Sequence, residues 1–351
     1  MPNSHYFDQN PPFPEDVPVL EIPRISFQQL QNANHASSVS MFEACREYGF
    51  FLLDLNHSDE GATLLQDAEK MFELITETFA LGSETLEKYA YDPPRDLTGY
   101  KATGKLKTDD GKLDLMEMYT INQDDIVGNR QARKNADSIE IRRNDIEQFM
   151  RHSHAIVAAV QSRLDEQLGI RSGTLSSLNT LEETSDTSVR LLRSQPTPEL
   201  QDSSITLGGH TDIGTMTLLF NVIGGLQVLP AGNENVLGNW RYIRPRPGCA
   251  IINVGDTTVE WTGGLLRSSL HRVIRAPGEQ GTVPRQSVAY LVRPCHSASM
   301  SRLRGGIIPP LKEGEADETR PVSDWAAWRS KQIISGELKP QTRGGNPIVQ
   351  G

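Results

Sequence analysis

The chain has 351 residues, and its 35 Lys and Arg against 45 Asp and Glu give a formal net charge of −10. This acidic balance argues against a nucleic-acid binder, because phosphate binding needs clustered Lys and Arg, and no apolar run approaches the roughly 18 residues of a membrane-spanning helix. Cys45, Cys249 and Cys295 are too irregularly spaced for a disulfide framework or a metal motif, and the N-terminal segment lacks a signal-peptide pattern. We therefore expect a cytoplasmic protein with no nucleic-acid or membrane partner; its oligomeric state is unknown.

The first 180 residues combine short apolar strands with helices. Apolar runs, helical periodicity and the breaks between them predict a strand at 17–22, helical segments within 26–48, a buried strand at 50–55, helices at 61–81 and 83–89, a turn-rich stretch at 92–129 and a long helix at 144–168.

The next 120 residues change character and become rich in short strands bounded by Gly, Pro or Asn. The strands are predicted at 189–192, 215–221, 225–229, 240–243, 250–254, 269–274 and 286–292. Strands at such intervals are typical of an antiparallel sandwich or barrel. An amphipathic helix at 323–334 follows. We predict one integrated structural domain with an N-terminal helical and strand region (1–180), a β core (181–300) and a C-terminal helix and tail (301–351), because no flexible linker separates them.

The strongest local motif is a His-x-Asp pair inside Gly209-His210-Thr211-Asp212. In an extended chain, residues i and i+2 point to the same side, so an imidazole and a carboxylate lie together as a metal requires. The pair alone is a weak signal, because His57-Ser58-Asp59 repeats it in this chain without any supporting motif downstream. We interpret that second copy as structural.

A third ligand is predicted at His271, in a segment that alternates apolar and polar residues as a strand does. A neighbouring strand would bring it to the same interior as His210 and Asp212. Two histidines and one carboxylate occupy one face of an octahedral ion, which is the facial triad of non-haem Fe(II) oxygenases. Further along, Arg285 and Ser287 are also two apart, and a guanidinium with a hydroxyl suits a carboxylate ligand.

These motifs, together with Gly224 to Val228 and Ile252 to Asp256, occur in an order that resembles the Fe(II)/2-oxoglutarate-dependent dioxygenases of the isopenicillin N synthase-like family. The resemblance implies a mainly β fold with α-helices, in which a double-stranded β-helix (jelly-roll) core is wrapped by N-terminal and C-terminal helices. It implies His210, Asp212 and His271 as the Fe(II) ligands and catalytic centre, and 2-oxoglutarate and O₂ as cosubstrates. It further implies that Arg285 and Ser287 bind the distal carboxylate of 2-oxoglutarate.

One departure from the family pattern concerns Ser194, which stands where the family has a Tyr that helps to bind the 2-oxoglutarate carboxylate. A second departure is the longer gap between His271 and Arg285, and both features look like a microbial subset of the family associated with specialised metabolism. The implied function is hydroxylation, desaturation or ring formation on a small organic metabolite. The missing Tyr leaves an alternative open, a 2-oxoglutarate-independent oxidase on the same fold, and a non-catalytic binding protein is a third alternative. The substrate contacts predicted are Tyr100, Met118, Tyr119 and Phe220, and no substrate can be named from them.

Overall fold

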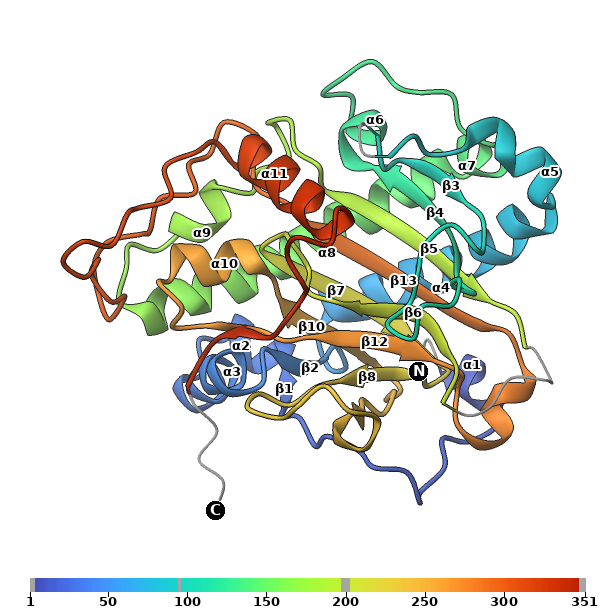
Figure 1. The fold of residues 1–351 in the computed structure, drawn as a ribbon, viewed down its shortest axis with the longest axis horizontal. Coiled ribbons are helices and arrows are strands. Elements are labelled where there is room, and N and C mark those ends of the chain that lie inside the picture. The colour runs from blue at the N-terminus through green and yellow to red at the C-terminus, as the bar shows by residue number, and fades with distance from the viewer. Residues whose placement is uncertain (1–3, 94–95, 197–202, 347–351) are drawn as a thin grey trace.

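Two β-sheets that face each other form the centre of the molecule (Figure 1). The structure is a computed structural model, and it describes residues 4–93, 96–196 and 203–346. The larger sheet has eight strands in the order β1-β2-β10-β7-β13-β5-β4-β3, and the smaller has four in the order β6-β12-β8-β9. The larger sheet comprises β1 (Arg24–Ser26), β2 (Phe50–Asp54), β3 (Gly99–Lys101), β4 (Glu117–Asn122), β5 (Ser188–Ser194), β7 (Met216–Asn221), β10 (Cys249–Val254) and β13 (Arg285–Val292). The smaller comprises β6 (Ile205–His210), β8 (Leu226–Val228), β9 (Arg241–Tyr242) and β12 (His271–Ile274). A separate pair joins β11 (Arg267–Ser268) to β14 (Arg343–Gly344).

The space between the two sheets is filled by an apolar cluster with members on both. Met118, Leu192 and Ala289 come from the larger sheet, and Val273 and Leu207 come from the smaller. Strand β13 shows the alternation clearly, because Ala289 belongs to this interior cluster while its neighbours Val288 and Tyr290 belong to a second core on the other side of the sheet. The larger sheet is therefore buried on both faces, which explains its near-continuous apolar strands.

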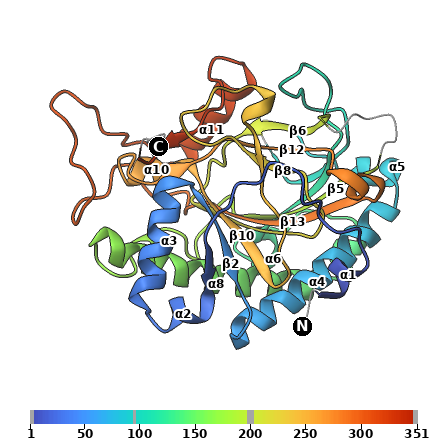
Figure 2. The same cartoon turned by 90° about the horizontal axis from the view of Figure 1, so that it is seen from below.

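Helices cover the outer face of the larger sheet, and Figure 2 shows α4 and α8 on the side away from β6 and β12. The helices are α1 (Ser4–Asp8), α2 (Phe27–Gln31), α3 (His35–Glu47), α4 (Asp59–Ala80), α5 (Ser83–Leu86), α6 (Gln123–Val127), α7 (Asp137–Ile141), α8 (Arg143–Leu168), α9 (Thr174–Ser177), α10 (Asp256–Trp261) and α11 (Val322–Ile334), with 3-10 turns at Glu87–Tyr89, Leu237–Asn239 and Gly278–Thr282. No helix within the described ranges is long and apolar enough to cross a membrane.

The long helices confirm the predictions from periodicity. Helix α4 begins where the Ser58 hydroxyl accepts a hydrogen bond from the Gly61 backbone N–H at 3.2 Å, an N-cap that satisfies one free donor of the first turn. Helix α8 ends at Gly169, whose φ of 69° is the left-handed conformation that favours glycine at a helix C-terminus.

The predicted strand at 17–22 is wrong. The structure has only an isolated parallel bridge between Val19 and Tyr242 there, and the regular strand β1 follows Pro23 instead. Pro18 and Pro23 carry no backbone N–H, so this stretch cannot donate a continuous ladder of hydrogen bonds. The turn-rich stretch at 92–129 also contains elements that the prediction missed, namely β3, β4 and α6.

Candidate metal and cosubstrate site

His210, Asp212 and His271 converge at one end of the smaller sheet. His210 ends β6, His271 begins β12, and the two residues are direct partners in the antiparallel pairing of these strands. Their rings lie with centroids 4.3 Å apart. Asp212 lies in the loop between β6 and β7, and one ligand atom from each of the three side chains lies within 4.8 Å of the others. The predicted neighbour relation of His271 to His210 is thus confirmed.

Hydrogen bonds fix the orientation of all three side chains. Nδ1 of His210 lies 2.9 Å from the Gly208 carbonyl oxygen, and Nδ1 of His271 lies 3.0 Å from the Ser269 carbonyl oxygen. A carbonyl only accepts, so Nδ1 of each ring carries the proton and Nε2 keeps its lone pair for a metal.

Asp212 is held in the same way by two residues that the sequence analysis did not single out. The Thr217 hydroxyl donates to Oδ2 of Asp212 at 2.6 Å, and the Asn253 amide donates to the same oxygen at 2.7 Å. Oδ1 is left to face His210, whose Nε2 is 3.9 Å away. Thr217 and Asn253 are paired residues of β7 and β10, so adjacent strands supply both donors.

The electrostatic setting favours the protonation states that a metal ion needs. Burial lowers the pKa of His210 to about 4, with the neighbouring His271 acting in the same direction. Burial works against ionisation of Asp212, but the two histidines and the hydrogen bonds from Thr217 and Asn253 outweigh it and hold the pKa of this carboxyl well below its ordinary value. At neutral pH the site presents a neutral His210 imidazole beside the Asp212 carboxylate.

These donors fit iron(II). Two imidazole nitrogens and one carboxylate oxygen on neighbouring strands are the ligand set of a facial triad. In the part of the chain that the structure describes, these three residues are the one group of His, Cys, Asp or Glu side chains close enough to hold a metal ion. The second His-x-Asp copy, formed by His57 and Asp59, is not part of such a group. Its residues lie at the start of α4, where Ser58 is the N-cap and Asp59 is the first helical residue.

Arg285 and Ser287 share the interior face of β13, as the i, i+2 spacing predicts. Nη1 of Arg285 donates to the Ser287 hydroxyl at 3.2 Å, and Nε donates to the Gly224 carbonyl at 2.7 Å. Arg285 is only 3% exposed, and burial lowers its pKa to about 10, so it remains a cation at neutral pH. Among the residues that the structure describes, this buried guanidinium has no acidic partner, so it suits the carboxylate of a ligand.

The departure at Ser194 lies beside this arginine. Ser194 of β5 is the direct partner of Arg285 of β13, and the next interior pair is Leu192 with Ser287. A Tyr at 194 would therefore stand next to the guanidinium, whereas the buried Ser194 leaves that volume to other groups.

The structure separates the four predicted substrate contacts. Met118 belongs to the interior cluster between the sheets. Tyr100, Tyr119 and Phe220 belong to the core on the helix side. There the Tyr100 hydroxyl donates to Glu117 at 3.1 Å, the Tyr119 hydroxyl lies 3.3 Å from Oδ1 of Asn135, and Phe220 packs against Phe149 of α8. The structure thus brings only Met118 to the face that the triad shares.

Comparisons with known proteins agree with this geometry. A family model described as the 2OG-Fe(II) oxygenase superfamily matches residues 185–294, and one described as non-haem dioxygenase in morphine synthesis N-terminal matches residues 22–140. Among solved structures, a Neurospora crassa protein crystallised in complex with alpha-KG and thymine superposes with a TM-score of 0.73 at 20% identity, over 93% of this chain and 99% of that one.

Curated relatives extend the similarity over most of the sequence. A 2-oxoglutarate-dependent dioxygenase of Aspergillus fumigatus is 28% identical over 92% of this chain and 88% of its own length. The oxidoreductase vrtI of Penicillium aethiopicum is 30% identical over 82% of this chain and 68% of its own length. The jelly-roll core expected from the motifs is confirmed, and the protein belongs to the Fe(II)/2-oxoglutarate-dependent dioxygenases, which use iron(II), 2-oxoglutarate and O₂.

Proposed function

We propose that this dioxygenase uses His210, Asp212 and His271 as its iron ligands, and Arg285 with Ser287 as its 2-oxoglutarate clamp. It couples decarboxylation of 2-oxoglutarate to the hydroxylation, desaturation or ring closure of a small organic molecule in specialised metabolism. The observation that carries this proposal is the convergence of three oriented ligand atoms within 4.8 Å. Fungal 2-oxoglutarate-dependent dioxygenases among the relatives support it.

Some protein groups bind the iron, and others orient the cosubstrate. Iron(II) bound to such a triad supplies one-electron and O₂ chemistry at coordination positions that the protein leaves open. His210 and His271 present Nε2 because their Nδ1 protons are bound by backbone carbonyls. Arg285 provides the fixed cation that orients the distal carboxylate of 2-oxoglutarate, so that the reacting end of the cosubstrate is placed before reaction.

A 2-oxoglutarate-independent oxidase is the second candidate, and the observation that favours it is Ser194. This buried hydroxyl lies opposite Arg285, where the family has a Tyr that contributes to cosubstrate binding. The two candidates differ in one product, because only the first forms succinate in step with substrate oxidation.

The test is succinate and CO₂ formation by the purified chain with Fe(II), 2-oxoglutarate, ascorbate and air. We expect H210A and D212A to abolish it, while H57A, which alters the other His-x-Asp copy, serves as the matched control and keeps it. R285Q should raise the 2-oxoglutarate concentration for half-maximal turnover by about 10- to 100-fold, since it removes a charge-assisted hydrogen bond. Undiminished turnover in H210A and D212A would contradict the ligand assignment, and substrate oxidation without succinate would favour the oxidase.

The proposal also covers the location of the enzyme and the kind of partner it binds. We infer a cytoplasmic location and a small molecule, rather than nucleic acid or membrane, as partner. Cys45, Cys249 and Cys295 are buried free thiols, as suits a reducing compartment, and the net charge of −10 disfavours polyanions.

A further inference from the structure

A cavity of about 500 Å³ opens between the larger sheet and the C-terminal helix α11. Its walls include Thr120 of β4, Arg190 of β5 and Arg293, which directly follows β13. Helix α11 contributes four small side chains, among them Ala326 and Ser330, and one further cation, Lys331. Small residues on the covering helix leave room for an organic molecule, and the volume is in the range of small-ligand sites.

Arg190 lines this cavity from the interior face of β5, the face that carries Leu192 of the apolar cluster between the two sheets. Arg190 also interacts with the candidate metal centre, because its positive charge lowers the pKa of His210, while the charge of Asp212 raises the pKa of Arg190. Along the interior face of β5, Arg190 and Ser194 are four residues apart, which corresponds to roughly 13 Å of strand. Ser194 is the partner of Arg285, so the two arginines lie toward opposite ends of one face, with Leu192 and Ser287 paired between them.

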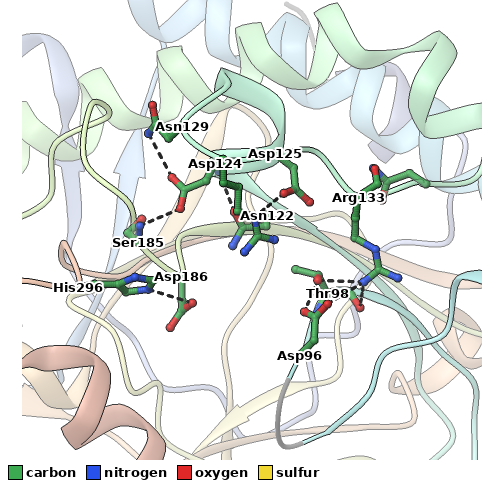
Figure 3. Close-up of polar contacts among 12 residues, drawn as sticks. Asp96, Thr98, Asn122, Asp124, Asp125, Asn129, Arg133, Ser185, Asp186 and His296 are labelled. Carbon is green, nitrogen blue, oxygen red and sulfur yellow. Dashed lines mark hydrogen bonds and ion pairs between the residues drawn. The ribbon is translucent and has the colours of Figure 1, made fainter.

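Each acidic side chain in the cavity wall already has a basic partner. Asp186 lies 3.2 Å from Nε2 of His296, and Asp96 lies 3.2 Å from Nη1 of Arg133. Figure 3 shows these two contacts, together with the nearby Asp124, which is held by Asn129 and Ser185. The lining residue Arg130 is likewise paired with Asp125.

Arg190 and Arg293 differ from these residues. In the described ranges, neither guanidinium has a hydrogen bond or an ion pair with another side chain, and Nε of Arg190 is buried without a partner. Burial and then the like charge of Arg293 lower the pKa of Arg190 to about 10, while the charge of Asp212 opposes them. Asp212 is itself a candidate iron ligand. A metal ion bound to Asp212 would offset its negative charge, so less of that charge would remain to compensate Arg190.

Two neighbouring guanidinium groups that have no hydrogen-bonded or ion-paired acidic side chain among the described residues repel each other in a partly buried site, although Asp212 and Asp186 offset part of their charge. An anion bound between them would relieve both repulsion and desolvation. We propose that this cavity is the substrate site and that its substrate is an organic anion, whose carboxylate is held by the guanidinium of Arg190 with Arg293 as the second positive charge. This inference rests on the proposed function, and it adds the class of substrate and the residue that selects it.

The test is calorimetric binding to the full chain loaded with Mn(II), which replaces iron without supporting turnover, and saturated with 2-oxoglutarate. The probes are two matched pairs, benzoate with benzamide and phenylacetate with phenylacetamide, which keep shape and change charge. We expect each carboxylate to bind at least about tenfold more tightly than its amide, as a charge-assisted hydrogen bond predicts.

The R190Q variant should lose this preference and still bind 2-oxoglutarate as the wild type does. R190K, which keeps the charge but not the planar fork, should retain part of it. R151Q removes the same charge from the exposed side of α8, where Arg151 pairs with Glu147, and should retain all of it. Melting curves check folding, and R190K carries the comparison if R190Q does not fold.

Three results would overturn the inference: amides that bind as tightly as their carboxylates, an intact preference in R190Q, or no measurable binding of any probe. A carboxylate that binds only by displacing 2-oxoglutarate would also overturn it, because it would be occupying the Arg285 site. Failure of the wild type to bind 2-oxoglutarate at all would instead contradict the proposed function, so the two failures are distinguishable.

Discussion

Single hydrogen bonds decide which atoms of the triad face the metal position. The Asp212 carboxylate has one oxygen engaged by Thr217 and Asn253, and its other oxygen is directed toward His210. The hydrogen bonds from Thr217 and Asn253 therefore orient the Asp212 carboxylate. Partners of this kind fix ligand orientation and tune metal affinity.

This role of Thr217 leads to a prediction at the residue scale. T217V preserves the size of the side chain but removes the donor to Asp212, and we expect it to weaken Mn(II) or Fe(II) binding by about 10- to 100-fold. T217S keeps the hydroxyl and should bind metal nearly as the wild type does. Metal titration under anaerobic conditions measures the effect, with a melting curve for each variant. Equal metal affinity in T217V and the wild type would show that Thr217 does not position the ligand.

At the scale of elements, the link between β8 and the preceding turn depends on Gly225. Its φ of +102° is a conformation that L residues rarely adopt, and a Cβ there would lie 2.6 Å from the Ile274 carbonyl oxygen of β12 and 3.4 Å from Nε of Arg285. The smaller sheet thus approaches Arg285, the candidate cosubstrate arginine, closely only because residue 225 has no side chain.

We expect G225A to destabilise the protein by about 1–3 kcal/mol more than G232A, because only the first adds a clash to the backbone strain. Gly232 is the matched control, since it also has a positive φ, of +81°, but has open space around its Cβ position. Urea unfolding of both variants measures the difference. Similar losses in the two would indicate that the close approach at Gly225 is relieved by small movements of the chain.

Local patterns were sufficient to predict many of these elements. Apolar runs located β2, β7, β10 and β13, and helical periodicity located α4 and α8, because each pattern lies within a few consecutive residues. The pair His210 and Asp212 was visible for the same reason. Strand β4 was missed because it is buried on both faces yet contains Thr120 and Asn122, so it shows neither alternation nor a purely apolar run.

Features made by distant segments were beyond such reasoning. Thr217 and Asn253 are ordinary strand residues until β7 and β10 pair and bring both to Asp212. Arg190 has no distinguishing sequence neighbours, and it becomes a cavity residue only because α11 packs over the sheet. Among the predicted substrate contacts, Tyr119 and Phe220 have strand parities that place them on the helix side, a consequence of register that no single segment reveals.

At the scale of the whole molecule, distant parts of the chain meet in the same sheets. Strands β1 to β4 extend the sheet that β5, β7, β10 and β13 begin, and β14 near the C-terminus pairs with β11. Backbone hydrogen bonds therefore join the three regions 1–180, 181–300 and 301–351, although residues 347–351 lie outside the described ranges. That these regions form one integrated structural domain remains our prediction.

The C-terminal helix is anchored by a buried ion pair. Nε of Arg329 on α11 donates to Oδ2 of Asp256 at 2.7 Å, and both side chains are almost fully enclosed. The same carboxylate oxygen accepts a hydrogen bond from the Thr211 hydroxyl at 3.1 Å, and Thr211 stands between the candidate ligands His210 and Asp212.

We expect R329M to destabilise the protein by about 3–5 kcal/mol, because it leaves a buried carboxylate without its main partner. R320M, which breaks the more exposed pair of Arg320 with Glu318, should cost only about 0–1 kcal/mol. Urea unfolding compares the two, and the double variant R329M/D256N should recover part of the loss. A loss in R329M no larger than that in R320M would mean that the pair contributes little to holding α11.

Different residues of α11 have different roles, and this has an evolutionary consequence. Arg329 binds Asp256, which also accepts a hydrogen bond from Thr211, the residue between the candidate ligands His210 and Asp212. Ser323, Ala327 and Ser330 line the cavity without belonging to the apolar core, unlike the buried Ala326, so their side chains can be changed without opening that core. On the proposal that this cavity holds the substrate, these positions on one helix give directed evolution a compact target for altering specificity.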